Sequence, residues 1–343
     1  MRLTADQIQI VKAARDCITQ HQNRERLAEK TCDDYRKTSR RLFRDLPNKP
    51  KAAAARAWEN AAQTRSKNTW FKRKAALIFF AQEGLRRTLS RQDQIQRALR
   101  RQPTAELTQE FDRALLGLEF YTHLLQEIPD KPQTPQRRIS KRQHIQGLPP
   151  DWALRVAVDC PDYQQAILVQ AATGCRPAEL VSGVVAEIDG DLLVCTVKGA
   201  KVTAAAGQPM RTMTFQLGQN SSPILRVLAQ AVAVAGGKKT IQIQNPKYYS
   251  KAFERAAANA FPGRRKSLTP YCLRHQFSAA LKAEGHTPEE IAAALGHAAT
   301  KSQSFYGTAG QGSGGTGLLV IEASRPVRRV SKPMPDQSDG PRP

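Results

Sequence analysis

The sequence predicts a mainly α-helical protein with a small antiparallel β-sheet, an α+β fold, in two domains. The 343 residues are enough for two domains of ordinary size. Helical periodicity runs through residues 1–127, whereas residues 148–306 combine helical stretches with three short β-like runs. Residues 128–147 contain three prolines and several basic residues without periodicity, which predicts an extended basic linker. Residues 307–343 follow as a glycine-rich leash, a strand-like segment and a tail.

The first domain is expected to consist of helices with strongly basic surfaces. Residues 31–46 place apolar side chains near one face and Lys and Arg around the rest, and Pro47 and Pro50 end this helix. Residues 66–82 begin polar and basic and then become apolar, so the start of this helix can lie on a charged partner while its end is buried. A third helical pattern covers residues 104–127.

The second domain is expected to open with a helix over residues 152–172. Three β-like runs between Val184 and Phe215 are joined by two turn dipeptides, Asp189-Gly190 and Gly199-Ala200, as in an antiparallel meander. Helices are then expected over residues 222–235, 250–261 and 272–284, and a last one that is capped by Thr287 and Glu290 and ends near Gly296.

Composition excludes several protein classes. Mean hydropathy is −0.51, and no apolar run approaches the length needed to span a membrane. The N-terminus lacks a hydrophobic segment behind a basic start, so we expect no secretory signal and a cytoplasmic protein with access to the nucleoid. Six cysteines are scattered without a CxxC pair, which favours reduced, packed thiols over disulfides or a zinc site. We expect neither metal nor cofactor.

The net charge indicates a polyanionic partner. The chain carries +23 in total, with 31 Lys and Arg against 16 Asp and Glu in residues 1–150 and 22 against 14 in the remainder. The first half is therefore the more basic, as expected if it grips phosphates while the second half performs chemistry.

Two arginines, a histidine and a tyrosine in the second domain have spacings that suggest one catalytic centre. Arg176 lies within TGCRPAEL, Arg274 follows 98 residues later, His297 lies 23 residues beyond that, and Tyr306 a further 9. Breaking a DNA phosphodiester with a phenol requires fixed cations for the non-bridging oxygens and an acid for the leaving oxygen. Guanidinium groups stay protonated and bind phosphate with two parallel hydrogen bonds, so the arginines suit the first role.

These motifs resemble those of the tyrosine recombinases, also called phage-type integrases. The first motif of that family reads roughly T-G-x-R-x-x-E-L, and residues 173–180 here read TGCRPAEL. The second usually reads H-x-L-R-H, and residues 271–275 read YCLRH; a later L-G-H is matched by residues 295–297, before Tyr306. The match covers roughly residues 148–306. The resemblance implies a helical core-binding domain and a catalytic domain that close on DNA as a C-shaped clamp.

The resemblance also implies a role for each site residue. Tyr306 would be the nucleophile that forms a 3′-phosphotyrosyl bond, Arg176 and Arg274 would clamp the scissile phosphate, and His297 would hydrogen-bond the phosphate or the nucleophile. Glu179 would orient Arg176. The general acid of the family is a lysine in the β-hairpin, where Lys198 fits the position better and Lys201 is the alternative.

One position departs from the family pattern. The usual histidine three residues before the second arginine is Tyr271 here. A phenol can donate a hydrogen bond to a phosphate oxygen but brings no positive charge at neutral pH. We therefore expect Tyr271 either to assist catalysis through its hydroxyl or only to pack, with reduced activity.

Contacts with DNA are expected from basic residues of the first domain and the linker. The candidates are Arg40, Lys67, Lys72, Arg73, Lys74, Lys141 and Arg142. The linker would pass along the duplex between the domains or serve only as a flexible connection. The leash with its strand-like segment would reach a neighbouring protomer or fold back on its own domain.

The function expected from the resemblance is site-specific recombination of double-stranded DNA through a Holliday junction. It would serve integration or excision of a mobile element, or resolution of replicon dimers or cointegrates. The active form would be a homo-oligomer, with a dimer on each DNA site and a tetramer in the synapse. An accessory DNA-bending protein is a possible partner, and no association with a membrane is expected. The alternatives are a catalytically weak DNA-binding relative and a strand-passage enzyme of the type IB topoisomerase kind.

Overall fold

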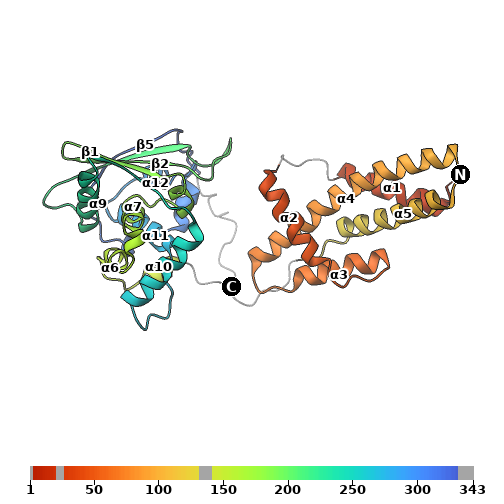
Figure 1. Cartoon of the computed structure of the whole chain (residues 1–343), viewed down its shortest axis with the longest axis horizontal. Helices are drawn as coiled ribbons and strands as arrows, with labels where there is room; N and C mark the ends of the chain where they lie inside the picture. Colours follow the sequence, from red (N-terminus) through yellow and green to blue (C-terminus); the bar gives the residue numbers. More distant parts are fainter. Residues whose placement is uncertain (1–2, 21–26, 131–140, 331–343) are drawn as a thin grey trace, which may run out of the picture. The chain divides into compact units, whose positions relative to one another are not determined.

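The computed structural model describes residues 3–20, 27–130 and 141–330 of the chain. The chain divides into two compact units, Met1–Arg138 and Ile139–Pro343, which are drawn in Figure 1 and are considered separately below. The predicted fold class is confirmed, because the first unit is helical and the second combines helices with one small antiparallel sheet. Within the described ranges, no helix is both long and apolar enough to cross a membrane.

The first unit is a bundle of helices. Its elements are α1 (Ala5–Gln20), α2 (Glu29–Leu42), α3 (Pro50–Ala62), α4 (Lys67–Arg101) and α5 (Ala105–Gln126). Ser66 and Thr104 cap α4 and α5 by accepting hydrogen bonds from backbone N–H groups three residues later. The predicted helices are present, but Pro50 opens α3 at its first position as well as following α2.

Helix α4 is twice the length that residues 66–82 suggested, since its apolar positions continue to Leu99 and pack along α5. Gly84 lies at the contact between the two helices. A Cβ atom on Gly84 would lie 2.5 Å from the ring of Tyr121, so only glycine allows this close approach. The core of the unit also contains the paired rings of Trp58 and Trp70, whose centroids are 6.1 Å apart.

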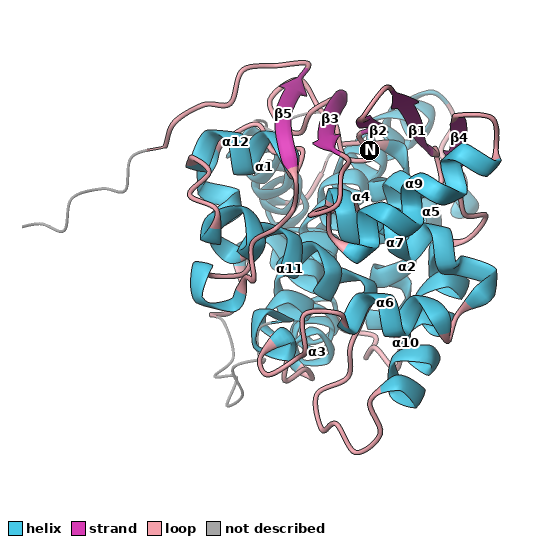
Figure 2. Ribbon diagram, turned by 90° about the vertical axis from the view of Figure 1, so that its left-hand side faces the viewer, coloured by secondary structure: helices cyan, strands magenta, loops and turns pink. Residues whose placement is uncertain are grey.

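The second unit is built on a five-stranded antiparallel sheet. Its strands are β1 (Val184–Asp189), β2 (Leu192–Lys198), β3 (Met210–Gln216), β4 (Lys238–Ile241) and β5 (Leu318–Ala323), in the spatial order β4-β1-β2-β3-β5. Figure 2 shows the strands side by side in this order. Alternate residues of β1, β2 and β3 are buried, as expected for a sheet that packs one face on a core.

Helices cover the buried face of this sheet (Figure 1). They are α6 (Trp152–Val158), α7 (Gln164–Thr173), α8 (Pro177–Leu180), α9 (Pro223–Val234), α10 (Pro246–Ala260), α11 (Pro270–Ala283) and α12 (Pro288–Ala294). Single 3-10 turns occur at η1 (Lys141–Ile145), η2 (Pro161–Tyr163), η3 (Thr300–Phe305) and η4 (Ala309–Gln311). Helix α11 lies at the centre of the unit and is buried along most of its length.

Two expectations for this unit were wrong in detail, and one strand was missed. The single helix over residues 152–172 is divided into α6 and α7, because Pro161 lacks the N–H that a continuous helix requires. The strand β4 was not anticipated from its short, largely polar sequence. Residues 141–147, placed in the extended linker, instead begin the unit with η1, which packs on α11 through buried Ile145. Of the rest of the expected linker, residues 128–130 belong to no helix or strand, and residues 131–140 lie outside the described residues.

The segment after Tyr306 folds back on its own unit. Strand β5 pairs with β3, so the strand expected from LLVIEA is present. Of the two expected arrangements, contact with a neighbouring protomer or with its own domain, the structure has the second. The glycine-rich leash lies close against α11, because Cβ atoms on Gly307 and Gly312 would lie 2.4 Å and 2.2 Å from the carbonyl oxygens of His275 and Ala279. Glycine therefore permits close packing here.

Candidate active site

The first motif forms a turn that presents Arg176. Helix α7 ends at Gly174 with φ of 61°, a left-handed conformation, and a Cβ atom there would lie 2.4 Å from the ring of Phe277. Arg176 precedes α8, and Glu179 accepts hydrogen bonds from both the backbone N–H and the Nη1 of Arg176, at 2.7 Å and 2.6 Å. Glu179 is fully buried, so its carboxylate fixes the guanidinium from the inner side.

Burial alone would raise the pKa of Glu179, but the nearby Arg211 and Arg176 outweigh this effect and hold its pKa at about 2. The carboxylate is therefore ionised across the physiological range. Arg211 was not singled out from the sequence. It lies on β3 with no exposed side-chain surface and donates from Nη2 to Glu179 at 2.9 Å.

Arg274, on α11, is fully buried and connects two distant segments. Its Nη1 donates to the carbonyl of Gly174 at 2.7 Å, and its Nη2 donates to the carbonyl of Leu295. The same Nη2 lies 3.0 Å from Nε2 of His297. Burial and the neighbouring Arg176 lower the pKa of Arg274 to about 10, so the group remains a cation at neutral pH. The two arginines predicted from the sequence thus belong to one cluster.

His297 follows α12 and is neutral. Burial, together with Arg274 and Arg176, lowers its pKa to about 3. Because an arginine is only a donor, Nε2 of His297 must accept from Arg274, and the ring proton is then on Nδ1. This Nδ1 and the Nε of Arg274 are buried and have no hydrogen-bond partner among the described residues.

Tyr306 directly follows η3, and its ring lies on the same cluster. The guanidinium carbon of Arg274 is 5.0 Å from the centre of the Tyr306 ring, and the ring of His297 is 5.5 Å away, centroid to centroid. The Tyr306 ring is half-buried against the core of the unit. Residues that are 130 positions apart in the sequence, from Arg176 to Tyr306, therefore converge on one site.

A second histidine contacts the tyrosine. The ring of His275, the residue directly after Arg274, lies 5.0 Å from that of Tyr306, centroid to centroid. Burial, with Arg274 and then Arg142, lowers the pKa of His275 to about 4. The sequence contained a signal for this residue, its place beside Arg274 in the second motif, but no role was assigned to it.

Three of the predicted catalytic positions are not joined to the cluster. Lys198 is exposed at the end of β2, Lys201 is exposed in the loop that follows, and Tyr271 is 40% exposed in the first turn of α11. Among the described residues, no hydrogen bond or ion pair connects any of them to Arg176, Arg274, His297 or Tyr306. Their catalytic roles stay predictions. Within the same ranges, no cluster of His, Cys, Asp and Glu suited to a metal ion is found.

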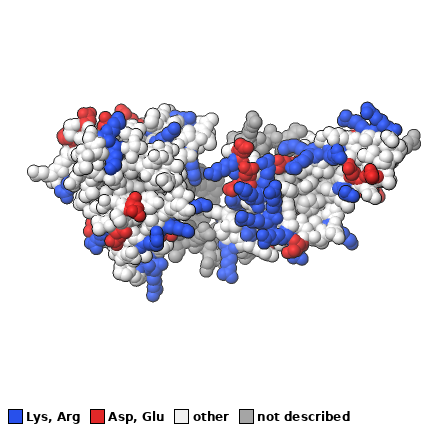
Figure 3. Space-filling view, in the orientation of Figure 1, with Lys and Arg blue, Asp and Glu red and all other residues white. Residues whose placement is uncertain are grey.

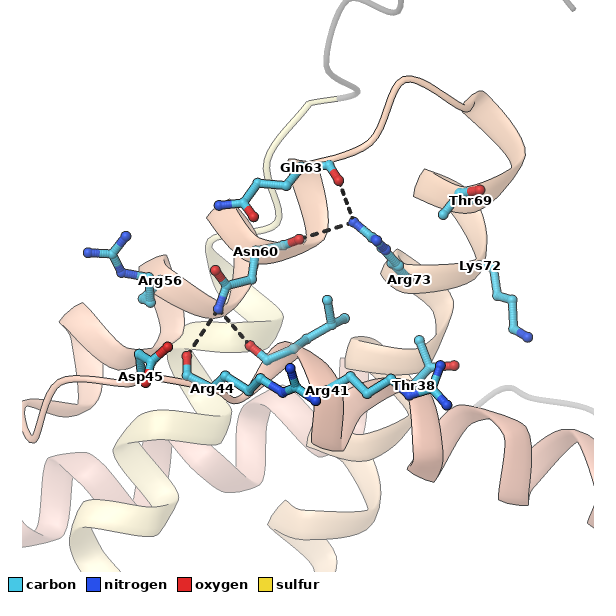
Figure 4. Close-up of a pocket in the computed structure, with 11 residues that line it drawn as sticks. Thr38, Arg41, Arg44, Asp45, Arg56, Asn60, Gln63, Thr69, Lys72 and Arg73 are labelled. Atoms are coloured by element: carbon cyan, nitrogen blue, oxygen red, sulfur yellow. Dashed lines mark hydrogen bonds between the residues drawn. The ribbon is translucent and has the colours of Figure 1, made fainter.

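The first unit carries a basic surface over α2 and the start of α4, where Lys and Arg side chains gather (Figure 3). A cavity of about 740 Å³ opens there between α2, α3 and α4, lined by Arg41, Arg44, Arg56 and Lys72 among others (Figure 4). Asn60 donates to the carbonyls of Leu42 and Arg44, which holds the end of α2 against α3.

The predicted DNA contacts have different surroundings. Arg40 and Lys67 are exposed, Lys74 is half-buried, and exposed Lys72 is ion-paired with Asp34 at 3.2 Å. Arg73 donates from Nη1 to the carbonyls of Asn60, Ala61 and Gln63, so it also caps the end of α3 (Figure 4). In the second unit, Arg142 lies close enough to lower the pKa of His275, and Lys141 begins η1 with a side chain outside the described part.

Among known proteins, similarity is found to solved structures. No protein-family model and no curated protein matches the chain. The crystal structure of XerA recombinase is 15% identical, with 88% of this chain and 93% of that chain covered and a TM-score of 0.34. A lambda integrase dimer bound to a COC′ core site is 15% identical, with 85% and 75% covered and a TM-score of 0.48. XerH recombinase bound to difH substrate, in a pre-cleavage complex, is 16% identical, with 82% and 94% covered and a TM-score of 0.36.

Proposed function

We propose that this protein is a site-specific tyrosine recombinase, which cleaves and rejoins double-stranded DNA through a 3′-phosphotyrosyl intermediate on Tyr306. The observation that carries the proposal is the convergence of a phenol, two guanidinium groups and a neutral imidazole at one site. The basic surface of the first unit supports it, because such a surface binds the DNA backbone.

The unpartnered donors of the cluster favour an anionic ligand. A buried N–H without an acceptor costs about 1–3 kcal/mol, and the Nε of Arg274 and the Nδ1 of His297 are both in this state beside the Tyr306 ring. A phosphate supplies several acceptor oxygens and a negative charge. A scissile phosphate bound against Tyr306 would therefore satisfy these donors and balance the charge of Arg176 and Arg274.

The reaction follows from the chemistry of these groups. The phenol of Tyr306 gives up its proton to water as its oxygen attacks phosphorus, and the bond to the 5′ oxygen breaks. The leaving oxygen takes a proton from Lys198, with Lys201 as the alternative donor, and the lysine is reprotonated from water. Arg176 and Arg274 stabilise the charge that develops on the phosphate, while His297, held neutral, donates a hydrogen bond from Nδ1. The phosphotyrosyl bond conserves the energy of the phosphodiester, so rejoining needs no ATP.

Attack by a hydroxyl from a second duplex converts cleavage into strand exchange through a Holliday junction. This step requires two sites in one assembly, a dimer on each site and a tetramer in the synapse. The reaction would serve integration or excision of a mobile element or the resolution of replicon dimers, in a protein that acts at the nucleoid. In this arrangement Arg40, Lys67, Lys72 and Lys74 of the first unit would lie near phosphates.

Covalent trapping tests the proposal. The purified protein is incubated with a pool of nicked duplexes drawn from the DNA that flanks its gene, and protein-linked DNA is recovered after denaturation. We expect an adduct whose DNA is attached to Tyr306 and ends in a 3′ phosphate, and we expect none with Tyr306→Phe. Tyr248→Phe is a suitable control, because this tyrosine is exposed on α10 outside the cluster. An adduct that persists in Tyr306→Phe would disprove the assignment of the nucleophile.

One observation favours a second candidate, a DNA-binding relative with weak cleavage. Tyr271 replaces the histidine of the family motif and is exposed rather than joined to the cluster. Duplex binding without any adduct in the trapping experiment would support this candidate. A strand-passage enzyme of the type IB topoisomerase kind would instead relax supercoiled DNA without joining two sites.

A further inference from the structure

Arg211 is a fully buried charge that the proposed reaction does not use. It lies on β3 at an inward position of the alternating pattern, where the next inward residues are Met213 and Phe215. Burying a guanidinium raises the free energy of the folded state unless the group is paired. An apolar residue of similar size would therefore stabilise the core at least as well. The position therefore calls for a specific role.

The contacts of Arg211 connect two segments of the candidate site. On one side its Nη2 donates to Oε2 of Glu179 at 2.9 Å, while Oε1 of the same carboxylate binds Nη1 of Arg176 at 2.6 Å. On the other side its Nε donates to the carbonyl of Ala294 at 2.7 Å, three residues before His297.

Gly296 explains why the second segment fits closely against this guanidinium. Its φ is +67°, and a Cβ atom there would lie 2.7 Å from Nη1 of Arg211. The glycine of the L-G-H sequence thus allows the chain to pass over the arginine on its way to His297. Within the described part of the chain, no hydrogen bond, ion pair or ring contact joins Arg211 to Tyr306, in contrast to Arg274, so it acts through its neighbours.

We infer that Arg211 is a positioning residue for the phosphate-binding site: through the shared carboxylate of Glu179 it fixes Arg176, and through the Ala294 carbonyl it fixes the segment that carries His297. The inference rests on the proposed function, because it assigns a role in that same reaction. It adds a residue that touches neither phosphate nor nucleophile but holds two groups that do.

The charges around Glu179 determine how the loss of Arg211 would change the pKa of this carboxyl group. Arg176 from the start of α8, Arg211 from β3 and Arg274 from α11 all favour its ionised form, whereas burial opposes it. Two other titratable groups among the described residues interact with it: His297, which is neutral, and Cys175, whose pKa is raised to about 12 mainly by burial. Without Arg211, burial is less well compensated, so the pKa of Glu179 rises and a protonated Glu179 holds Arg176 less firmly.

The test compares the rate of Tyr306 adduct formation at about pH 8 and about pH 5.5, with a nicked duplex that the parent protein cleaves. Arg211→Met should form the adduct roughly 10- to 100-fold more slowly at the higher pH, because a charge-assisted hydrogen bond to the carboxylate is lost. At the lower pH it should lose about a further tenfold relative to the parent, as Glu179 becomes protonated.

Three further variants separate positioning from a general loss of stability. Met213→Ala removes a buried side chain from the same face of β3. It should lower the rate of adduct formation, relative to the parent, by the same factor at both pH values. Arg211→Lys keeps a charge near Glu179 and should lose rate without the extra loss in acid. Glu179→Gln combined with Arg211→Met has no carboxylate to titrate and should also lack the acid effect.

The outcomes are distinct. If the parent protein forms no adduct on any duplex, the proposed function fails. If the parent does form it and Arg211→Met shows the same pH dependence as the parent and Met213→Ala, the positioning role is wrong. An acid loss in Arg211→Lys equal to that of Arg211→Met would likewise overturn it.

Discussion

His275 and His297 show how the site sets the protonation state of single side chains. Both are buried beside Arg274, and both face the ring of Tyr306. Burial, followed by the charge of Arg274, lowers their pKa values to about 4 and about 3. In the described cluster around Tyr306, the positive charge therefore comes from Arg176 and Arg274, while the imidazoles serve as neutral hydrogen-bonding groups beside the phenol.

These pKa values predict how stability depends on pH. The histidines of an unfolded chain have a pKa of about 6.5, so the unfolded state takes up protons first as the pH falls. The free energy of unfolding of the second unit should be highest above about pH 6.5 and fall towards pH 4, by up to about 1.4 kcal/mol per pH unit for each histidine. Glu179, with its pKa lowered to about 2, adds a further loss only below its ordinary pKa.

Urea unfolding of the His275→Gln variant measures this effect. The decrease in unfolding free energy between about pH 6.5 and pH 4 should be smaller than in the parent, because one of the protons is no longer taken up. His123→Gln, on α5 of the other unit, is the control and should leave the decrease unchanged. A decrease as steep in His275→Gln as in the parent would contradict a neutral, buried His275.

At the scale of elements, a glycine permits the close approach of α4 to α5 at one point of their contact. The two helices are 35 and 22 residues long, and Gly84 brings them together over the ring of Tyr121. That ring is itself held between Phe80 and Phe120, with centroid distances of 6.0 Å and 5.2 Å, so it has little freedom to move. The basic start of α4 is thereby carried on a helix whose later turns are firmly packed.

Gly84→Ala should destabilise the first unit by about 1–3 kcal/mol, despite the higher helix propensity of alanine, because the new methyl group overlaps the Tyr121 ring. Gly117→Ala, on α5, is the matched control. Its Cβ atom would lie 3.5 Å from Thr88, an ordinary contact, so the variant should be neutral or more stable by up to about 1 kcal/mol. Thermal unfolding of both variants compares them directly, and equal stability of the pair would argue against the close contact.

Across the whole second unit, the segment after the nucleophile completes the fold. Strand β5 extends the sheet beside β3, and buried Leu318 joins the core. Beyond it, Arg325 donates to the carbonyl of Thr203 at 2.7 Å, and Gln208 donates to the carbonyls of His297 and Arg325. The segment thus connects the loop after β2, where Lys201 lies, to the residues that lead to Tyr306.

A chain that ends at Gly317 should therefore have a less stable second unit than the full chain. It loses β5, Leu318 and the contacts of Arg325, and it exposes the edge of β3. We expect a lower unfolding temperature and slower adduct formation. A chain that ends at Val330 keeps all these contacts and should match the full protein in both measurements. If the shorter chain were as stable and as active as the longer one, the intramolecular role of β5 would be refuted.

Local sequence determined much of this protein. Caps, prolines and periodicity located most helices, turn dipeptides located the hairpin strands, and the spacing of Arg176, Arg274, His297 and Tyr306 identified the groups that converge. These features could be predicted because each depends on residues close together in the chain or on a motif that the chain shares with a known family.

Only the tertiary structure decided how these parts meet. In the sequence, Arg211 looks like any other basic residue, and only its inward position on β3 brings it to Glu179. The sequence of β5 likewise does not show which strand edge it joins, and the fold places it beside β3. The full burial of Arg274 and the resulting neutrality of His297 likewise depend on helices from distant positions packing around them. The physical reason is the same in each case: burial and pairing are properties of the assembled unit, whereas propensity and spacing belong to the chain.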